Sequence, residues 1–398
     1  MKKILLATTA TAMIAGAAHA ESHSNAIKMG VILGFTGPIE SLTPSMAAGA
    51  EIAMKEISDS GKLLGGAMIE PVRADSTCVD SAAATAAAER LITSDGVKGI
   101  MGSDCSGVTG AILANVAVPN GMVMISPSAT SPALSSAEDN GLFFRTAPSD
   151  ARQGAVLASI LLDKGINSVA VTYTNNDYGK GFADAFNENY TAGGGTVTLT
   201  AAHEDGKADY SAEVGALASA GGDALVVLGY VDQGGAGIIQ ASLDTGAFDQ
   251  FALGDGMIGD SLTAKFGSDI DGAIGTIAGS ENEGGPKFAE LAAAAGIDGT
   301  AVYAGESYDA AALILLAMAA ANSSEPADYA GKIMDVANAP GEVILPGELD
   351  KALEILAAGG EIDYAGATGV ELVGPGEAAG SYAEYTVEGG ALKVVGYH

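Results

Sequence analysis

Three polar loops carry the residues whose types and spacing are best suited to binding a small molecule. The first loop, Gly102-Ser-Asp-Cys-Ser-Gly107, contains Ser106, which we expect to cap the helix that follows. Free N–H groups at a helix start, together with a hydroxyl group, form a site for an anion such as a carboxylate. Ordinary helix capping explains the same residues equally well, so both interpretations stay open.

The other two loops offer further polar groups and an aromatic ring. The second loop, Ile125-Ser-Pro-Ser-Ala-Thr-Ser-Pro132, is stiffened by two prolines and presents hydroxyl, N–H and carbonyl groups at Ser128 and Thr130. The third, Asn175-Asn-Asp-Tyr-Gly-Lys-Gly181, carries Tyr178 as a candidate lid. A plain proline-rich turn and a simple turn tyrosine are the alternatives.

Residues for covalent catalysis are scarce in this sequence. A catalytic Ser-His-Asp or Cys-His arrangement needs a histidine held in a pocket, and the only candidate, His203, lies in a polar stretch that we interpret as a solvated loop. One GxGxxG run spans Gly254 to Gly259, but Asp255 within it would face a dinucleotide pyrophosphate with a carboxylate. We therefore expect no enzyme, no cofactor and no metal site.

Composition excludes several classes of partner. The 398 residues give a prior of two or three domains, and 48% hydrophobic against 17% charged residues is enough for packed cores. The net charge of -31 repels phosphate backbones and anionic lipid. We expect a soluble monomer that binds neither nucleic acid nor a membrane surface.

The first 20 residues read as a secretory signal peptide. Lys2 and Lys3 precede an apolar run, Ile4 to Ala17, and Ala18-His-Ala20 fits the cleavage rule. The run is too short to span a bilayer, which takes about 20 residues. Export to the bacterial periplasm is the prediction.

Two cysteines, Cys78 and Cys105, remain in the exported chain. An even number in an oxidising compartment favours one disulfide. It would close a loop of about 28 residues and stabilise the fold by roughly 3–4 kcal/mol. Two free thiols are the alternative.

Strand-like and helix-like segments alternate along the chain, which predicts parallel sheets covered by helices on both faces. Strands are expected at 27–33, 68–74, 97–101, 123–126, 168–173, 196–200, 224–229 and 251–254, with helices between them and a final hairpin at 382–387 and 391–395. Ligands of such sheets bind beyond the carboxyl ends of the strands. Two similar α/β halves therefore predict a site between them.

Taken together, these loops resemble the type I periplasmic binding proteins, specifically the Leu/Ile/Val-binding family of ABC importers. The resemblance covers the whole exported chain and is carried by Gly34-Phe-Thr-Gly-Pro38, Cys105-Ser106, Ile125-Ser-Pro-Ser-Ala-Thr130, Phe144-Arg-Thr146, Asn176-Asp-Tyr-Gly-Lys-Gly181, Glu306-Ser-Tyr-Asp-Ala310 and the block from Ala357 to Thr368.

The resemblance implies an α/β fold of two doubly wound parallel-sheet lobes joined by a three-segment hinge. One lobe would comprise residues 26–148 and 280–373, and the other residues 149–279 and 374–398. The implied function is that of a periplasmic solute-binding protein, which delivers an amino-acid-like zwitterion to an inner-membrane ABC permease. A ligand sensor on the same fold and an exported hydrolase are the alternatives.

The resemblance also implies roles for individual residues around the ligand. Ser106 and Thr130 would bind the ligand carboxylate, and the carbonyl of Ser128 would accept from the ammonium group. Tyr178 would cover the ligand from the other lobe.

Further residues would complete the recognition of the ammonium group. Tyr230 and Asp255 match the family positions for this role, with Asp255 as the counter-ion of a buried cation. The family's disulfide matches Cys78 paired with Cys105.

The sequence departs from the family around the ligand side chain. Asp104 replaces an apolar residue, Leu42 lies where a large aromatic residue can form the wall, and Tyr303 lines the same pocket. One hypothesis is a ligand with a polar or cationic side group that pairs with Asp104. The alternative is an Asp104 turned to water or to a backbone N–H.

Overall fold

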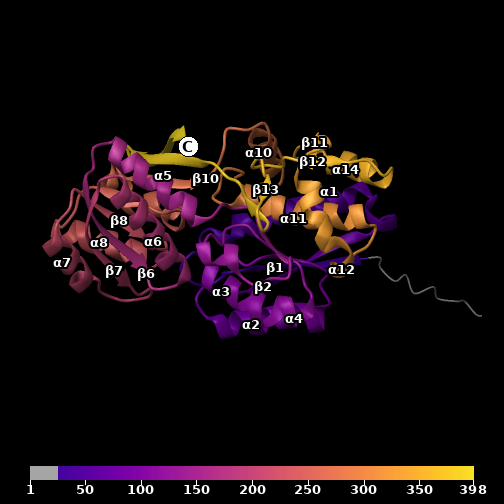
Figure 1. Cartoon of the computed structure of the whole chain (residues 1–398), viewed down its shortest axis with the longest axis horizontal. Helices are drawn as coiled ribbons and strands as arrows, with labels where there is room; N and C mark the ends of the chain where they lie inside the picture. The colour runs from indigo at the N-terminus through magenta and orange to yellow at the C-terminus, as the bar shows by residue number, and fades with distance from the viewer. Residues whose placement is uncertain (1–25) are drawn as a thin grey trace, which may run out of the picture.

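Two seven-stranded sheets organise the chain in the computed structural model, which describes residues 26–398. The signal peptide predicted for residues 1–20 lies outside the described residues. Figure 1 shows each sheet with its helices as one lobe, and the two lobes lie next to each other along the long axis. The predicted fold class, two α/β lobes built on parallel strands, is confirmed.

The first sheet has the strand order β13-β14-β5-β4-β3-β1-β2, and its first five strands in the chain are parallel. These strands are β1 (Ala26–Leu33), β2 (Met68–Asp75), β3 (Ile100–Gly102), β4 (Met124–Ser126), β5 (Phe143–Arg145), β13 (Leu372–Val373) and β14 (Glu377–Ala378). The helices of this lobe are α1 (Thr43–Ser60), α2 (Ser81–Arg90), α3 (Ser106–Ile112), α4 (Val118–Asn120), α10 (Gly284–Ala294), α11 (Ala304–Ala321), α12 (Pro326–Tyr329), α13 (Ile333–Ala337) and α14 (Leu349–Ala357). A two-stranded sheet, β11 (Glu342–Ile344) with β12 (Ile362–Tyr364), lies in the same lobe.

The second sheet has the order β16-β15-β10-β9-β8-β6-β7, with β6 to β10 parallel and the terminal hairpin antiparallel. Its strands are β6 (Ser168–Thr174), β7 (Thr196–His203), β8 (Ala224–Leu228), β9 (Phe251–Leu253), β10 (Ile274–Ala278), β15 (Tyr382–Glu388) and β16 (Ala391–Tyr397). The helices are α5 (Asp150–Asp163), α6 (Asp177–Ala192), α7 (Ser211–Ala220), α8 (Gly234–Thr245) and α9 (Asp260–Phe266).

The central strands form because apolar runs are buried on both faces of a parallel sheet. All five residues of β8 are buried, and its sequence is a continuous run of Ala, Leu and Val. Strand β10 was not predicted. Its run Ile-Gly-Thr-Ile-Ala contains a glycine and is followed by another, and glycine is depleted in strands, so pattern alone does not indicate a strand there.

Helix α11 is the core of the first lobe. Among the described residues it is the one helix long and apolar enough to cross a membrane by length and composition, but 78% of it is buried inside the protein. It packs against α1, α13 and α14, of which α1 and α14 are labelled beside it in Figure 1. Its apolar surface is therefore covered by this chain's own helices.

Within residues 26–398 the chain crosses between the sheets three times, after β5, after β10 and after β14. The predicted division gave residues 374–398 to the second lobe. Strand β14 instead pairs with β5 through Glu377 and Arg145, whose side chains also form an ion pair. The last crossover therefore follows Ala378, because this buried arginine holds β14 on the first sheet.

The three crossovers surround a cavity of about 210 Å³, into which Glu306 of α11 also projects. The Glu306 side chain is 7% exposed, and burial raises its pKa from 4.5 to about 8. The folded protein thus keeps a proton on Glu306 that the unfolded chain releases at lower pH. Stability contributed by this group is present below about pH 4.5 and is lost as the pH rises to about 8.

Replacing Glu306 with glutamine is expected to remove this pH dependence. The wild-type free energy of unfolding should fall with rising pH by up to about 1.4 kcal/mol per pH unit more steeply than that of E306Q. Urea unfolding of both proteins at several pH values between about 5 and about 9 measures the difference. Two parallel curves would show that Glu306 is not the titrating group.

Candidate functional site

A small cavity of about 20 Å³ lies between the lobes, and we call it the inner cavity. It is lined by Ile39, Leu42, Asp104, Cys105, Ser106, Ser128, Tyr178, Tyr230, Asp255, Gly256 and Tyr303. Most of these residues follow the carboxyl end of a parallel strand, as expected for open α/β sheets. Eight of the nine predicted ligand residues lie here. The ninth, Thr130, does not line the cavity.

Asp255 forms the centre of the polar contacts in the inner cavity. It is 2% exposed, and Tyr178 donates from its hydroxyl group to Asp255 Oδ1 over 2.7 Å. Tyr303, from the first lobe, donates to Oδ2. Burial raises the pKa of Asp255, and the two hydroxyl donors oppose that rise. Asp255 thus joins groups from both lobes.

The two tyrosines stay neutral and act as donors. Burial, and then the charge of Asp255, raise the pKa of both Tyr178 and Tyr303 well above that of a free phenol. Tyr303 also has a φ of 62° at the start of α11, a left-handed backbone that is rare outside glycine. Such conformations gather at functional sites.

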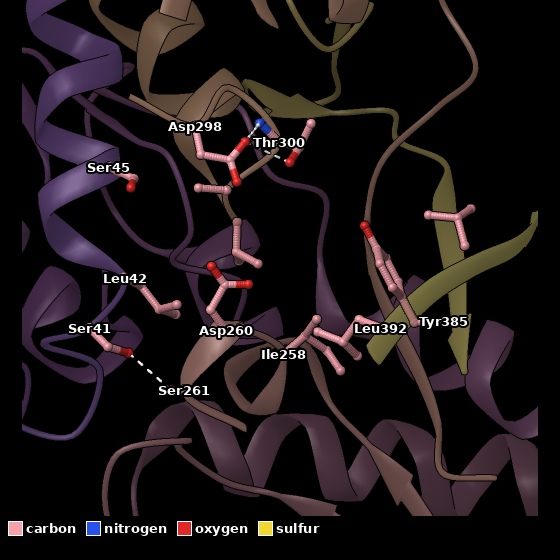
Figure 2. A pocket seen from close by; sticks show the side chains of 14 residues that line it. Ser41, Leu42, Ser45, Ile258, Asp260, Ser261, Asp298, Thr300, Tyr385 and Leu392 are labelled. Atoms are coloured by element: carbon pink, nitrogen blue, oxygen red, sulfur yellow. Dashed lines mark hydrogen bonds between the residues drawn. The ribbon is translucent and has the colours of Figure 1, made fainter. Parts of the chain in front are cut away.

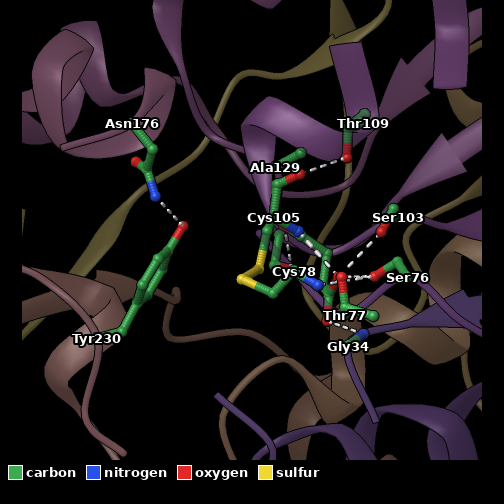
Figure 3. The surroundings of a disulfide bond; sticks show 12 residues. Gly34, Ser76, Thr77, Cys78, Ser103, Cys105, Thr109, Ala129, Asn176 and Tyr230 are labelled. Carbon is green, nitrogen blue, oxygen red and sulfur yellow. Dashed lines mark hydrogen bonds between the residues drawn. A yellow bond between two sulfur atoms is a disulfide. The ribbon is translucent and has the colours of Figure 1, made fainter. Parts of the chain in front are cut away.

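Tyr230 completes an aromatic wall in the second lobe. Its ring stacks on Tyr178 with centroids 5.2 Å apart and an interplanar angle of 17°. Asn176 donates from Nδ2 to the Tyr230 hydroxyl group over 3.3 Å (Figure 3), and its Oδ1 caps α6 by accepting from the Gly179 N–H. Asn176 was not predicted as a site residue, although it lies in the third polar loop.

Ser106 and Ser128 line the inner cavity from the first lobe, and we call this wall the serine side. Ser106 is the first residue of α3, and Cys105 occupies the N-cap position predicted for Ser106. The Ser106 hydroxyl oxygen accepts from the Ser131 N–H over 3.1 Å, and Ser128 donates to the Asp104 carbonyl over 3.1 Å. The predicted capping role of Ser106 is wrong, because its side chain bonds across to the neighbouring loop.

Thr130 and Asp150 are buried together behind this side. The Asp150 N–H donates to the Thr130 carbonyl over 2.9 Å. The Thr130 hydroxyl group and both carboxylate oxygens of Asp150 are buried, and a hydrogen bond from Thr130 favours the charged form of Asp150. Burial, and then the charge of Asp255, raise the pKa of Asp150 well above that of a free aspartate. No local sequence signal indicated Asp150.

Asp104 is held within the first lobe and directly precedes Cys105 of the disulfide. Its carboxylate accepts from the Gly34 N–H over 2.7 Å and from the Cys105 N–H over 2.9 Å. Hydroxyl groups of Ser76 and Ser103 donate to the same carboxylate. Burial raises its pKa, and these donors oppose the rise. Of the two alternatives, the structure shows the carboxylate turned to the backbone.

The predicted disulfide between Cys78 and Cys105 is present. It joins the loop after β2 to the start of α3, and both residues are 3% exposed. Because Cys105 also lines the inner cavity, the disulfide fixes the serine side of the site.

His203 is not in a solvated loop, contrary to the prediction. It ends β7, pairs in register with Thr174 and is 1% exposed. Its Nδ1 lies 2.8 Å from the Thr172 hydroxyl group, and burial lowers its pKa to about 4. The polar residues that follow His203 suggested a loop, but β7 continues as far as His203. Because the side chain is buried and its pKa is lowered, His203 is a neutral core residue.

Comparison with known proteins places this geometry in a family. Residues 26–343 match the family model described as "Periplasmic binding protein". The chain is 30% identical over 339 residues to Leu/Ile/Val-binding protein homolog 1 of Brucella melitensis, covering 83% of this chain and 87% of that protein. It is 29% identical over 265 residues to a leucine-, isoleucine-, valine-, threonine- and alanine-binding protein of Pseudomonas aeruginosa, covering 66% and 69%.

Solved structures share the fold. A leucine-binding protein from Thermotoga maritima superposes with a TM-score of 0.78 at 24% identity, covering 93% of this chain and 98% of that chain. A solute-binding protein of an ABC transporter from R. palustris, in complex with benzoate, gives 0.75 at 20% identity, covering 94% and 96%. The two lobes, the cleft between them and the match over most of the chain show that this protein belongs to the periplasmic binding protein family.

Proposed function

We propose that this protein is the periplasmic solute-binding protein of an ABC importer and that it captures an α-amino acid between its lobes. The observation that carries the proposal is Asp255, a buried carboxylate that faces a cavity which is also lined by Ser106, whose hydroxyl group can donate to a ligand carboxylate. An anion opposite hydrogen-bond donors matches a zwitterion, whose two charges must both be paired when buried. The names of the relatives from Brucella melitensis and Pseudomonas aeruginosa support the same ligand class.

In this proposal each end of the ligand has its own partners. Asp255, Tyr230 and the Ser128 carbonyl take the ammonium group, and Ser106 and Thr130 take the carboxylate. Thr130 does not line the inner cavity, so its part in this proposal requires the loop that carries it to shift when the ligand binds.

Capture requires the lobes to separate. A cavity of about 20 Å³ has room for roughly one water molecule. Besides the bond from Tyr303 to Asp255, contacts between lobes include the Ser41 N–H donating to Asp232 over 2.8 Å and Ser131 donating to the Asp177 carbonyl over 3.0 Å. The ligand would stabilise the closed arrangement by binding it better than the open one.

The lobes that move would be residues 26–148 with 280–378 and residues 149–279 with 379–398, the last division following the pairing of β14. We further propose a monomer in the periplasm that serves an inner-membrane permease and performs no chemistry. The net charge of -31 supports a soluble monomer.

Calorimetry with ligand-free protein tests the ligand class. The panel contains leucine, isoleucine, valine, arginine, citrulline and, as a carboxylate without an ammonium group, benzoate. We expect at least one amino acid to bind, and benzoate to bind at least about tenfold more weakly, because it would leave Asp255 buried without a cation. Benzoate binding more tightly than every amino acid would overturn the proposed function.

A further inference from the structure

A second and larger cavity of about 360 Å³ lies between the lobes, and we call it the outer cavity (Figure 2). The first lobe contributes residues 41–45, at the start of α1, and residues 298–302, before α11. The second lobe contributes residues 258–261, at the start of α9, and side chains of the terminal hairpin. The outer cavity is therefore part of the cleft that opens and closes.

The two cavities are neighbours along this cleft. Among the described residues, Leu42 alone lines both. Its side chain is 8% exposed and reaches the other lobe, where a Cβ built on Gly259 would lie only 2.8 Å from Leu42 Cδ2. Val302 of the outer cavity is followed directly by Tyr303 of the inner one. Leu42 thus lies at the boundary between the small inner cavity and the much larger outer one.

The outer cavity has a distinct chemistry. Its walls include the aliphatic side chains of Ile258 and Leu392, and the carboxylates of Asp260, from the second lobe, and Asp298, from the first, also line it (Figure 2). One oxygen of Asp298 accepts from the N–H and hydroxyl groups of Thr300. Within the described residues no lysine, arginine or histidine lines this cavity. An aliphatic chain with a cationic end complements it, and an anionic end does not.

We propose that the outer cavity extends the ligand site and receives the distal part of a long, unbranched amino-acid side chain with a cationic end, with Leu42 as the gate between the two cavities. This inference rests on the proposed function, since the α-amino and carboxylate groups of the ligand occupy the inner cavity. The ligand side chain leaves past Leu42, the residue that the two cavities share. Asp104 is not required, because its carboxylate is satisfied within the first lobe.

The length of the ligand side chain is expected to affect affinity more than its charge. Each further methylene group buried in the outer cavity strengthens binding roughly fourfold. Asp260 and Asp298 are both exposed, so screening limits their effect on a cation to roughly two- to fivefold. The expected order of affinity is arginine, then citrulline, then leucine.

Calorimetry with these three amino acids and the wild-type protein is the first test. Citrulline matches arginine in length without its charge, and leucine is compact. An arginine affinity above that of leucine supports the proposal, and an equal or lower one overturns it. If no amino acid binds and benzoate does, the proposed function itself fails, which is a different outcome from leucine binding best.

Substitutions at the gate provide the second test. L42W fills the passage between the cavities and is expected to lower the arginine-to-leucine affinity ratio by roughly fifteenfold, the effect of about two lost methylene groups. V395W adds the same indole to β16 at a side chain that is 53% exposed and outside both cavities, and it should leave the ratio unchanged. An unchanged ratio in a folded L42W would overturn the role of Leu42.

The double variant D260N D298N tests the cationic end without changing side-chain volume. It should weaken arginine binding by roughly two- to fivefold and leave citrulline binding unchanged. Because both side chains are exposed, this variant is expected to fold even if L42W does not. Equal losses for arginine and citrulline, or no loss for either, would overturn the assignment of a cation to the outer cavity.

Discussion

Replacing Asp255 with alanine is expected to weaken amino-acid binding by roughly 10²- to 10⁴-fold. The substitution removes the counter-ion of a buried ammonium group, which typically costs about 3–5 kcal/mol, and each 1.4 kcal/mol is a tenfold change in affinity. Asp255 is 2% exposed, so the ammonium group would be buried without an anion to pair with it. Calorimetry with the tightest-binding amino acid of the panel measures the effect.

Two further substitutions separate the contribution of the Asp255 charge to ligand affinity from that of its hydrogen bonds and packing. D255N keeps the side-chain volume and an acceptor for Tyr178 but removes the charge, and it should lose most of the affinity that D255A loses. Y303F keeps the charge and removes one hydroxyl donor to Asp255, and it should lose roughly tenfold, the lower value of a hydrogen bond to a charged group. A folded D255A that binds as well as wild type would refute the role of Asp255.

Removing the disulfide is expected to lower the free energy of unfolding by roughly 3–4 kcal/mol. In the chain-entropy model the bond restricts the unfolded chain by closing the loop between Cys78 and Cys105. Both cysteines are buried at the edge of the site, so the double variant C78S C105S also places two hydroxyl groups in a core region. Urea unfolding of the wild-type and variant proteins measures the change.

Reduction of the wild-type protein is the matched control for this substitution, because it breaks the bond without changing the residues. A reduced protein with the stability of C78S C105S shows that the covalent link is the stabilising feature. If reduction leaves the free energy of unfolding unchanged while the double variant loses stability, the cost belongs to the buried hydroxyl groups instead. Ligand affinity should fall in both forms, since Cys105 begins α3 beside Ser106.

Much of the fold was predictable from local patterns. Continuous apolar runs such as that of β8, alternating with helical spacing, indicate parallel strands with helices on both faces. The polar loops and the family resemblance together named nine ligand residues, and eight of them line one cavity, most of them because the carboxyl ends of parallel strands meet at one edge of each sheet.

Other features depended on contacts that no local pattern records. The GxGxxG run resembled a nucleotide motif, but its glycines are explained by close packing. A Cβ on Gly256 would lie 2.7 Å from the Gly229 carbonyl oxygen, and one on Gly259 would lie 2.8 Å from Leu42. His203 looked solvated because its neighbours in the chain are polar, yet Thr172 and the core surround it.

The sequence by itself determined the α/β class and the position of the cleft, because strand ends and residue types are local properties, and its family resemblance named Asp255 and Tyr230 as partners of an ammonium group. Only the tertiary structure decided that Asp104 turns to the backbone of its own lobe, that Asp150 is buried beside the site, and that Leu42 separates two cavities. The direction of a side chain and the space around it are set by segments far apart in the chain, which meet only when the two lobes have folded and closed.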